Sequence, residues 1–281
     1  MLPKQLFVFG FGYVASRLAL TLAPKGVATI GTTRTEASAA DLKTRGLNAV
    51  VWPGADITPP AGAAWLISVP PDDNGCPVFR SFGTTAKTAS WIGYLSTTGV
   101  YGDLGGGWAF EETPLNPQSR EAINRARAEA EWRSAGASIF RLPGIYGPGR
   151  SQLERVREPG ARRIVKEGQV FSRIHVADLA DLLALSIEQG GAPDIYNVCD
   201  DEPAPADQVL VYAAELLGLP PPPAVAFEDA NLSPAAQRFY AECKRVSNAK
   251  AKGVFGWAPQ HPNFREGLAD CLKRERELPK S

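Results

Sequence analysis

Apolar residues along the first two hundred positions fall into short runs that predict buried strands. Residues 6–9, 27–33, 49–52, 64–69, 91–96, 138–142 and 194–198 are mostly apolar or β-branched, and loop or helix-compatible segments separate them. Strands joined by connections of this length need crossovers, and crossovers place them side by side in a parallel sheet. The pattern therefore predicts an α/β protein.

Helical patterns lie between and after these runs. Val14, Leu18 and Leu22 share one helical face, and Pro24 and Gly26 end that helix. A charged, alanine-rich helix is expected at 119–133, and a third helix carries Leu179, Leu182 and Leu183.

The composition changes after residue 201. Six prolines punctuate 203–223 around a helix expected at 206–217, and Ser233-Pro234 is a helix start with serine at the N-cap. We predict a smaller, mainly helical lobe here. The expected division is 1–147 with 173–200 as the sheet domain, and 148–172 with 201–281 as the lobe.

Composition and charge exclude several classes of protein. The 281 residues are 44% hydrophobic with 30 basic and 30 acidic side chains, so a folded globule without a bulk charge for nucleic acid or an anionic membrane is expected. The apolar runs are too short to span a bilayer, and the N-terminus does not resemble a signal peptide. The cysteines are far apart without a C-x-x-C pair, which predicts reduced thiols in a cytoplasmic protein, and only two histidines could join them, which predicts no metal site. These residues are Cys76, Cys199, Cys243, Cys271, His175 and His261.

The first strand is followed by Gly10-x-Gly12-x-x-Ala15, which opens the first helix. Gly10 permits a tight turn, Gly12 removes a Cβ that would block a pyrophosphate, and Ala15 lets the helix approach the sheet. The start of the helix supplies unpaired N–H groups and a positive dipole. A glycine turn that serves only chain geometry is the alternative, but the strand and helix around it favour dinucleotide binding.

The end of the second strand favours NADP over NAD. An NAD site needs a carboxylate about 20 residues beyond the glycines, to bind the ribose 2′-hydroxyl. Thr33 and Arg34 stand there instead, and the Arg34 guanidinium suits a 2′-phosphate. The alternatives are that the site takes NAD or that Arg34 is only a solvated loop cation, and the nearby Glu36 leaves both open.

Several ordered motifs resemble one family. YLSTTGVYGD at 94–103, FRLPGIYGPG at 140–149, SRIHVADL at 172–179 and YNV at 196–198 resemble the extended and atypical short-chain dehydrogenase/reductases, which include NAD(P)-dependent epimerases and dehydratases. The resemblance covers nearly the whole chain. It implies a doubly wound Rossmann domain, with a small C-terminal lobe that closes over the nicotinamide end of the cofactor.

The resemblance also implies catalytic positions. In the family a Ser or Thr that matches Thr97 binds the substrate oxygen, and a Tyr-x-x-x-Lys pair on the next helix exchanges a proton and holds the ribose. Here that helix offers Glu121 and Arg125, or Ile123 and Arg127 in a second register. Neither register contains a phenol.

Other side chains have weaker signals. Tyr240-x-x-x-Lys244 repeats the family spacing, and helical spacing would place both on one face, but it lies far along the chain and we interpret it as accidental. Tyr101 and Tyr146 are secondary proton-donor candidates. His175 is expected ahead of a helix, with Asp178 as a cap near its start.

The sequence thus supports two functions. One is an NADP-linked oxidoreductase or epimerase-like enzyme acting on a nucleotide sugar or a small carbonyl or hydroxyl substrate; the other is a cofactor-sensing protein without turnover. Expected partners are a small-molecule substrate and, as one alternative, a second copy of the chain, with neither nucleic acid nor membrane. Candidate catalytic residues are Thr97 and Arg125, and candidate cofactor-binding residues are Gly10, Gly12, Tyr13, Val14, Thr33, Arg34, Ser68, Val69, Pro70, Ser96, Pro143 and Ile145.

Overall fold

Seven parallel strands form the central sheet of the computed structural model, which describes residues 2–190 and 192–277. In chain order they are β1 (Gln5–Phe9), β2 (Ala28–Thr33), β3 (Asn48–Val51), β4 (Ala64–Ile67), β5 (Trp91–Thr97), β7 (Ser138–Leu142) and β11 (Ile195–Asn197). Their order in the sheet is β11-β7-β5-β4-β1-β2-β3. All seven predicted strands are present within two residues of their predicted ends, and the predicted parallel sheet is confirmed.

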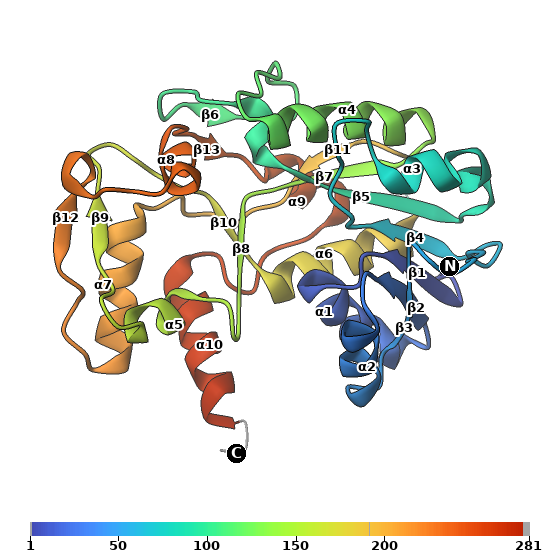
Figure 1. The fold of residues 1–281 in the computed structure, drawn as a ribbon, viewed down its shortest axis with the longest axis horizontal. Coiled ribbons are helices and arrows are strands. Elements are labelled where there is room, and N and C mark those ends of the chain that lie inside the picture. The colour runs from blue at the N-terminus through green and yellow to red at the C-terminus, as the bar shows by residue number, and fades with distance from the viewer. Residues whose placement is uncertain (1, 191, 278–281) are drawn as a thin grey trace.

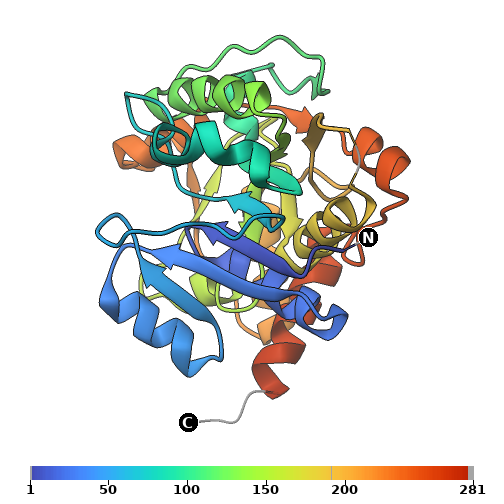
Figure 2. The ribbon, with the colours of Figure 1, turned by 90° about the vertical axis from the view of Figure 1, so that its right-hand side faces the viewer.

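Helices cover both faces of this sheet (Figure 1). On one side lie α1 (Tyr13–Leu22), α2 (Glu36–Thr44) and α6 (Val176–Gln189), and on the other α3 (Pro77–Phe82) and α4 (Arg120–Ser134). Leu6 and Val8 of β1 pack towards α1 and α6, whereas Phe7 and Phe9 pack into the core beneath α4. This alternation is why β1 reads as a continuous apolar run. The turned view shows the three layers, so the doubly wound fold is confirmed (Figure 2).

A second group of elements lies to one side of the sheet (Figure 1). It contains α5 (Gln152–Arg157), α7 (Ala206–Leu217), α8 (Pro234–Tyr240) and α10 (Phe264–Glu277), with a small sheet of β9 (Arg163–Val165) and β12 (Ala224–Ala226). The helix expected at 206–217 and the Ser233 N-cap are both present. Leu153, Phe264 and Leu268 belong to an apolar core of their own. We propose the division given above for the two lobes.

Short elements connect the two parts. β8 (Gly144–Tyr146) pairs with β10 (Arg173–His175), β6 (Trp108–Ala109) pairs with β13 (Arg245–Val246), and α9 (Ala249–Phe255) packs on α6 and β11. Short helical segments of three to six residues lie at Ala23–Lys25, Gly83–Thr88, Thr98–Tyr101 and Phe227–Asp229. Across the described ranges, no helix combines the length and the apolar character needed to cross a membrane.

Candidate functional site

The turn between β1 and α1 leaves room for an anion at the start of the helix. Gly10 has a φ of +89°, and a Cβ there would lie 3.1 Å from the backbone nitrogen of Val69, so this position needs glycine. A Cβ on Gly12 would meet nothing within 4 Å, so the space beside it is open. The amides of Tyr13 and Val14 begin α1 and have no carbonyl one turn earlier in the helix. The turn can therefore receive a pyrophosphate.

The other candidate cofactor residues follow the ends of neighbouring strands. Thr33 ends β2, Ser68 follows β4 and Pro143 follows β7. The Gly10 amide donates to the hydroxyl of Thr32 at 3.0 Å, and the Ser68 amide donates to the carbonyl of Phe9 at 2.8 Å. Because the carboxyl ends of parallel strands meet at one edge of the sheet, the candidates form a row along that edge.

The segment after β2 presents a cation rather than a carboxylate. Arg34 is exposed, and its side chain has no hydrogen bond or ion pair to any residue that the structure describes. Thr35 caps α2 by accepting a hydrogen bond from the Ser38 amide at 3.2 Å. Glu36 is the first residue of α2. An anion beside this turn would therefore meet the guanidinium first.

Thr97 lies where β5 ends and is half-buried. Its hydroxyl oxygen accepts a hydrogen bond from the Gly99 amide at 3.1 Å, which leaves the hydroxyl proton free to be donated. The preceding Ser96 is different, because its hydroxyl donates to the buried carboxylate of Glu129 at 2.6 Å. Only the backbone of Ser96 is therefore available to a cofactor.

A cleft of about 1090 Å³ begins at Thr97 and extends into the lobe. On the sheet side its walls include Ser119, Glu121, Pro143 and Ile145. On the lobe side they include Arg155, Arg162, Phe171, Arg238, Phe239 and Tyr240. The carboxylate of Glu121 and the guanidinium of Arg238 approach to 4.0 Å, so α4 and α8 face each other across the cleft. The cleft therefore opens at the carboxyl end of β5 and is bounded by both parts of the molecule.

The structure distinguishes the two registers of α4. Glu121 lines the cleft together with Thr97. Arg125 points towards β5 and donates to the carbonyl of Leu95 at 2.7 Å. In the second register Ile123 is 46% exposed on the outer surface. Glu121 and Arg125 therefore hold the positions next to the strand ends.

Arg127, the cation of the second register, is turned away from the cleft. Its guanidinium donates to the carbonyl of Asp73, in the loop that follows β4. The same loop binds Arg120 and Asn124 through the carboxylate of Asp73. These contacts fix the rotation of α4 about its axis.

Tyr240 and Lys244 are not a helical pair. α8 ends at Tyr240, and Lys244 stands in the extended segment before β13, so the expectation that helical spacing places them on one face is wrong. The ammonium group of Lys244 donates to the carbonyl of Gly102 at 2.6 Å and pairs with Glu242. Both side chains reach the wall of the cleft, but from different elements.

Two further tyrosines are buried, although Tyr146 also belongs to the lining of the cleft. Tyr101 is fully buried and donates to the side chain of Asn197 at 2.7 Å. Tyr146 is 5% exposed, with its hydroxyl close to Gly267 of α10. Burial raises the pKa of both phenols.

A buried polar network lies behind the end of β5. Arg141 of β7 and Glu129 of α4 form an ion pair at 2.7 Å, and each side chain is 3% exposed. Arg141 also donates to the hydroxyl of Tyr101 at 2.9 Å, and Glu129 accepts from Ser96. The network joins α4 to the strand that carries Thr97.

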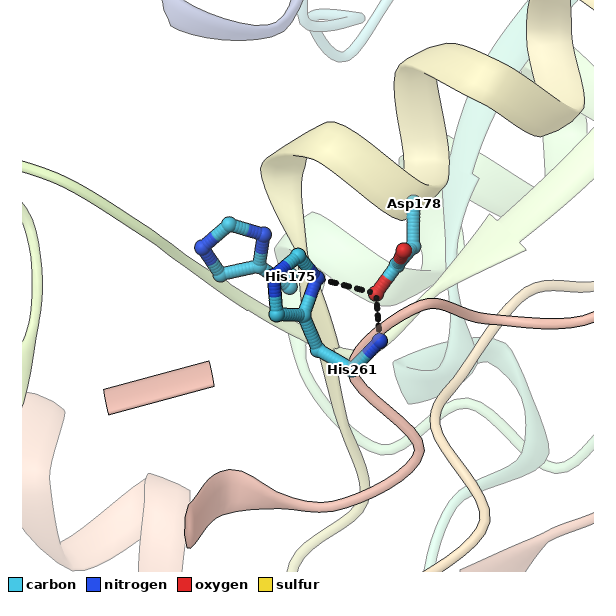
Figure 3. Close-up of side chains that lie close together, drawn as sticks. All are labelled: His175, Asp178 and His261. Carbon is cyan, nitrogen blue, oxygen red and sulfur yellow. Dashed lines mark hydrogen bonds and ion pairs between the residues drawn. The ribbon is translucent and has the colours of Figure 1, made fainter. Parts of the chain in front are cut away.

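His175, Asp178 and His261 form a compact buried cluster (Figure 3). His175 stands directly ahead of α6, as expected, and it is His175 that caps the helix, since its ring accepts from the Ala177 amide at 3.3 Å. Asp178 does not cap its own helix, which corrects that expectation. Its oxygens accept from the amides of Gln260 and His261 and from the His261 ring, at 2.8 to 3.1 Å.

The hydrogen bonds of this cluster join α6 to the segment before α10. Ligand atoms of the three residues lie within 4.8 Å of one another, close enough for an ion. N–H donors already occupy both carboxylate oxygens of Asp178, however. Burial and the neighbouring His261 lower the pKa of His175 to about 4, so it stays neutral.

Sequence reasoning missed the cations of the lobe wall. Arg155, Arg162 and Arg238 come from α5, the segment before β9 and α8, and no motif marks them. Their positions depend on how the lobe packs. The density of arginines in 150–173 is a sequence signal for Arg155 and Arg162, whereas Arg238 lies outside that segment.

Comparison with known proteins identifies the fold. No family model matches the chain. A solved protein from Silicibacter pomeroyi, described as functionally unknown and conserved, is 44% identical, with a TM-score of 0.92 over 96% of this chain and 99% of that one. A human epimerase family protein solved with NADPH has a TM-score of 0.77 and 15% identity, over 96% of this chain and 99% of that one.

A curated relative is also similar over part of the sequence. It is a 3-diazoavenalumate denitrifying reductase from Streptomyces sp, 32% identical over 177 residues. The match covers 56% of this chain and spans 57% of the length of that reductase. The chain therefore belongs to one family with the Silicibacter pomeroyi protein and has the fold of the epimerase/dehydratase-like short-chain dehydrogenase/reductases.

Proposed function

We propose that the chain is an NADP(H)-dependent oxidoreductase or epimerase-like enzyme. Its substrate would be a nucleotide sugar or a smaller molecule whose carbonyl or hydroxyl group reaches Thr97. One observation carries the proposal: the open space beside Gly12 and the mouth of the cleft at Thr97 share one edge of the sheet, with β4 between their strands. The NADPH in the human neighbour and the reductase name of the Streptomyces relative support it.

The residues present fit a nicotinamide dinucleotide. The amides of Tyr13 and Val14 would hold the pyrophosphate, and Arg34 would bind the 2′-phosphate. Arg125, beside β5, would face the nicotinamide ribose. When bound, the cofactor supplies or accepts a hydride, and the protein supplies the geometry and the proton partner.

Replacing Arg34 by alanine should abolish the preference for NADPH over NADH. A charge-assisted hydrogen bond contributes roughly 1.5 to 3 kcal/mol, so the ratio of the two dissociation constants should fall by about ten- to a hundredfold. Calorimetric titration of both cofactors into wild type and variant measures this ratio. A wild type that prefers NADH, or an Arg34→Ala ratio that matches wild type, would contradict the assignment.

Thr97 and Glu121 are the side chains we assign to proton chemistry. The Thr97 hydroxyl accepts from the Gly99 amide and so can donate its own proton to a substrate oxygen. The Glu121 carboxyl lies on the same wall and can exchange that proton with water. Arg125 remains protonated, so it stabilises charge and does not transfer a proton.

A substrate screen tests this assignment. Oxidation of NADPH is followed by absorbance with a panel of nucleotide sugars and small carbonyl compounds, for wild type, Thr97→Ala, Glu121→Gln and Tyr240→Phe. We expect kcat to fall by roughly a hundredfold or more in Thr97→Ala and Glu121→Gln, the range typical of acid-base groups. Tyr240→Phe should retain kcat within a few-fold.

Other outcomes have definite meanings. Turnover that survives Thr97→Ala and disappears in Tyr240→Phe would move the active site to the lobe wall. NADPH binding with no turnover in any sample would favour a cofactor sensor. That second candidate is favoured by one observation, namely that α4 has neither tyrosine nor lysine.

A further inference from the structure

Three aromatic side chains line the lobe end of the cleft: Phe171, Phe239 and Tyr240, here called the aromatic shelf. The rings of Phe171 and Phe239 stack with their centroids 4.3 Å apart and an interplanar angle of 9°. Tyr240 meets the edge of Phe171 at 5.4 Å. Phe239 is 55% exposed, although large apolar side chains are normally buried. The shelf thus offers a flat apolar face to a ligand.

Two arginines stand beside this shelf. Arg155 of α5 and Arg162 are exposed and line the same cleft, and neither side chain has a hydrogen bond or ion pair within the part of the chain that the structure describes. Side chains alternate along an extended segment, so Arg162 points to the same side as Ile164. Ile164 packs with Tyr240 in one apolar cluster. Arg162 therefore lies next to the shelf.

The acidic side chains around these arginines are mostly committed elsewhere. Glu154 accepts from both the amide and the hydroxyl of Ser151, at 2.7 and 2.6 Å. Glu242 pairs with Lys244. Among the described residues, Glu158 is the carboxylate of this wall that lacks a partner. The two free guanidiniums offer charged hydrogen-bond donors to an anion, while Glu158 in the lining and Asp207 near Tyr240 are the free carboxylates at this end among the described residues.

Part of the remaining wall is apolar. Ile164, Val170 and Leu210 line the cleft, and each is less than 9% exposed. A nucleoside placed there would lose water from its ribose hydroxyls and base edges without gaining hydrogen bonds from these side chains. An aromatic ring with one anionic group would satisfy both the apolar wall and the arginines.

We propose that the lobe end of the cleft binds an aryl carboxylate, with its ring on the aromatic shelf and its carboxylate at Arg155 and Arg162. This proposal names a substrate class for the proposed function. It rests on the proposed function for turnover of the ligand, but not for binding of the ligand. The ligand's reactive group would then extend along the cleft towards Thr97. Binding is measurable without turnover, so the two proposals fail separately.

Calorimetric titration with three probes tests the site: 2-naphthoate, its neutral counterpart 2-naphthalenemethanol, and uridine monophosphate. The naphthoate should bind about tenfold more tightly than the alcohol, as expected for one charge-assisted contact. Arg162→Gln should reduce this difference, and the double variant Arg155→Gln/Arg162→Gln should remove it. Phe239→Ala should weaken both naphthyl probes by roughly two- to tenfold through lost stacking. Arg133→Gln, at the far end of α4, is the matched control and should bind like wild type.

Thermal melts of the variants keep the result interpretable. Phe239 and Arg162 are exposed, so both variants should melt like wild type. Equal affinity for naphthoate and its alcohol, or an Arg162→Gln affinity that matches Arg133→Gln, would overturn the proposal. Tighter binding of uridine monophosphate that depends on Phe239 would assign the shelf to a nucleotide instead.

Discussion

Replacing Gly12 by valine is expected to weaken NADPH binding at least about a hundredfold and to leave the fold intact. The added methyl groups would occupy the open space beside the turn, where the pyrophosphate must approach the amides of α1. Loss of two charge-assisted hydrogen bonds costs roughly 3 to 6 kcal/mol, or about a hundred- to ten-thousandfold in affinity.

Folding should tolerate this change for a conformational reason. Gly12 has a φ of −113° and a ψ of −157°, an extended conformation that valine adopts, and its Cβ would meet no other atom. Loss of a glycine N-cap costs about 1 kcal/mol or less. Urea unfolding of apo wild type and variant, together with calorimetric titration of NADPH, measures both quantities.

Gly10→Ala is the matched contrast within the same turn. Its φ of +89° and the contact with Val69 strain any side chain, so this variant should lose stability. Gly12→Val should instead lose binding. Unchanged NADPH affinity in Gly12→Val would remove the cofactor from this turn.

The sequence predicted the elements whose signals are local. Each central strand is mostly apolar or β-branched, because both faces of a parallel sheet are covered, and the Gly10–Gly12 turn follows directly from its spacing. The N-cap Ser233 was likewise visible, since a helix start needs a side-chain acceptor at a fixed position.

Features set by tertiary packing were not predictable. β6 and β13 have two residues each, too few for any alternation, and they pair across 135 residues or more of chain. Tyr240 and Lys244 have helical spacing, but Pro234 starts a helix that ends at Tyr240. The rotation of α4 depends on Asp73 in a distant loop, so spacing alone could not choose between Glu121 and Ile123.

The buried network behind β5 leads to the second large effect: Arg141→Met should destabilise the protein by about 3 to 5 kcal/mol. The substitution leaves the Glu129 carboxylate buried without its cation, and removal of one partner of a buried pair has this cost. Tyr101 and the carbonyl of Glu111 would also lose a hydrogen-bond donor. Urea unfolding monitored by far-UV circular dichroism gives the free energy of unfolding.

The double variant Glu129→Gln/Arg141→Met separates charge from packing. If the uncompensated carboxylate dominates the cost, the neutral glutamine should recover at least about 1 kcal/mol relative to Arg141→Met alone. Arg133→Met, exposed on the same helix, should stay within about 0.5 kcal/mol of wild type. A loss that is the same in the single and double variants would instead assign the stability to side-chain packing. Ser96 belongs to this network and precedes Thr97 at the end of β5. The network therefore also helps to fix the backbone that positions the Thr97 hydroxyl.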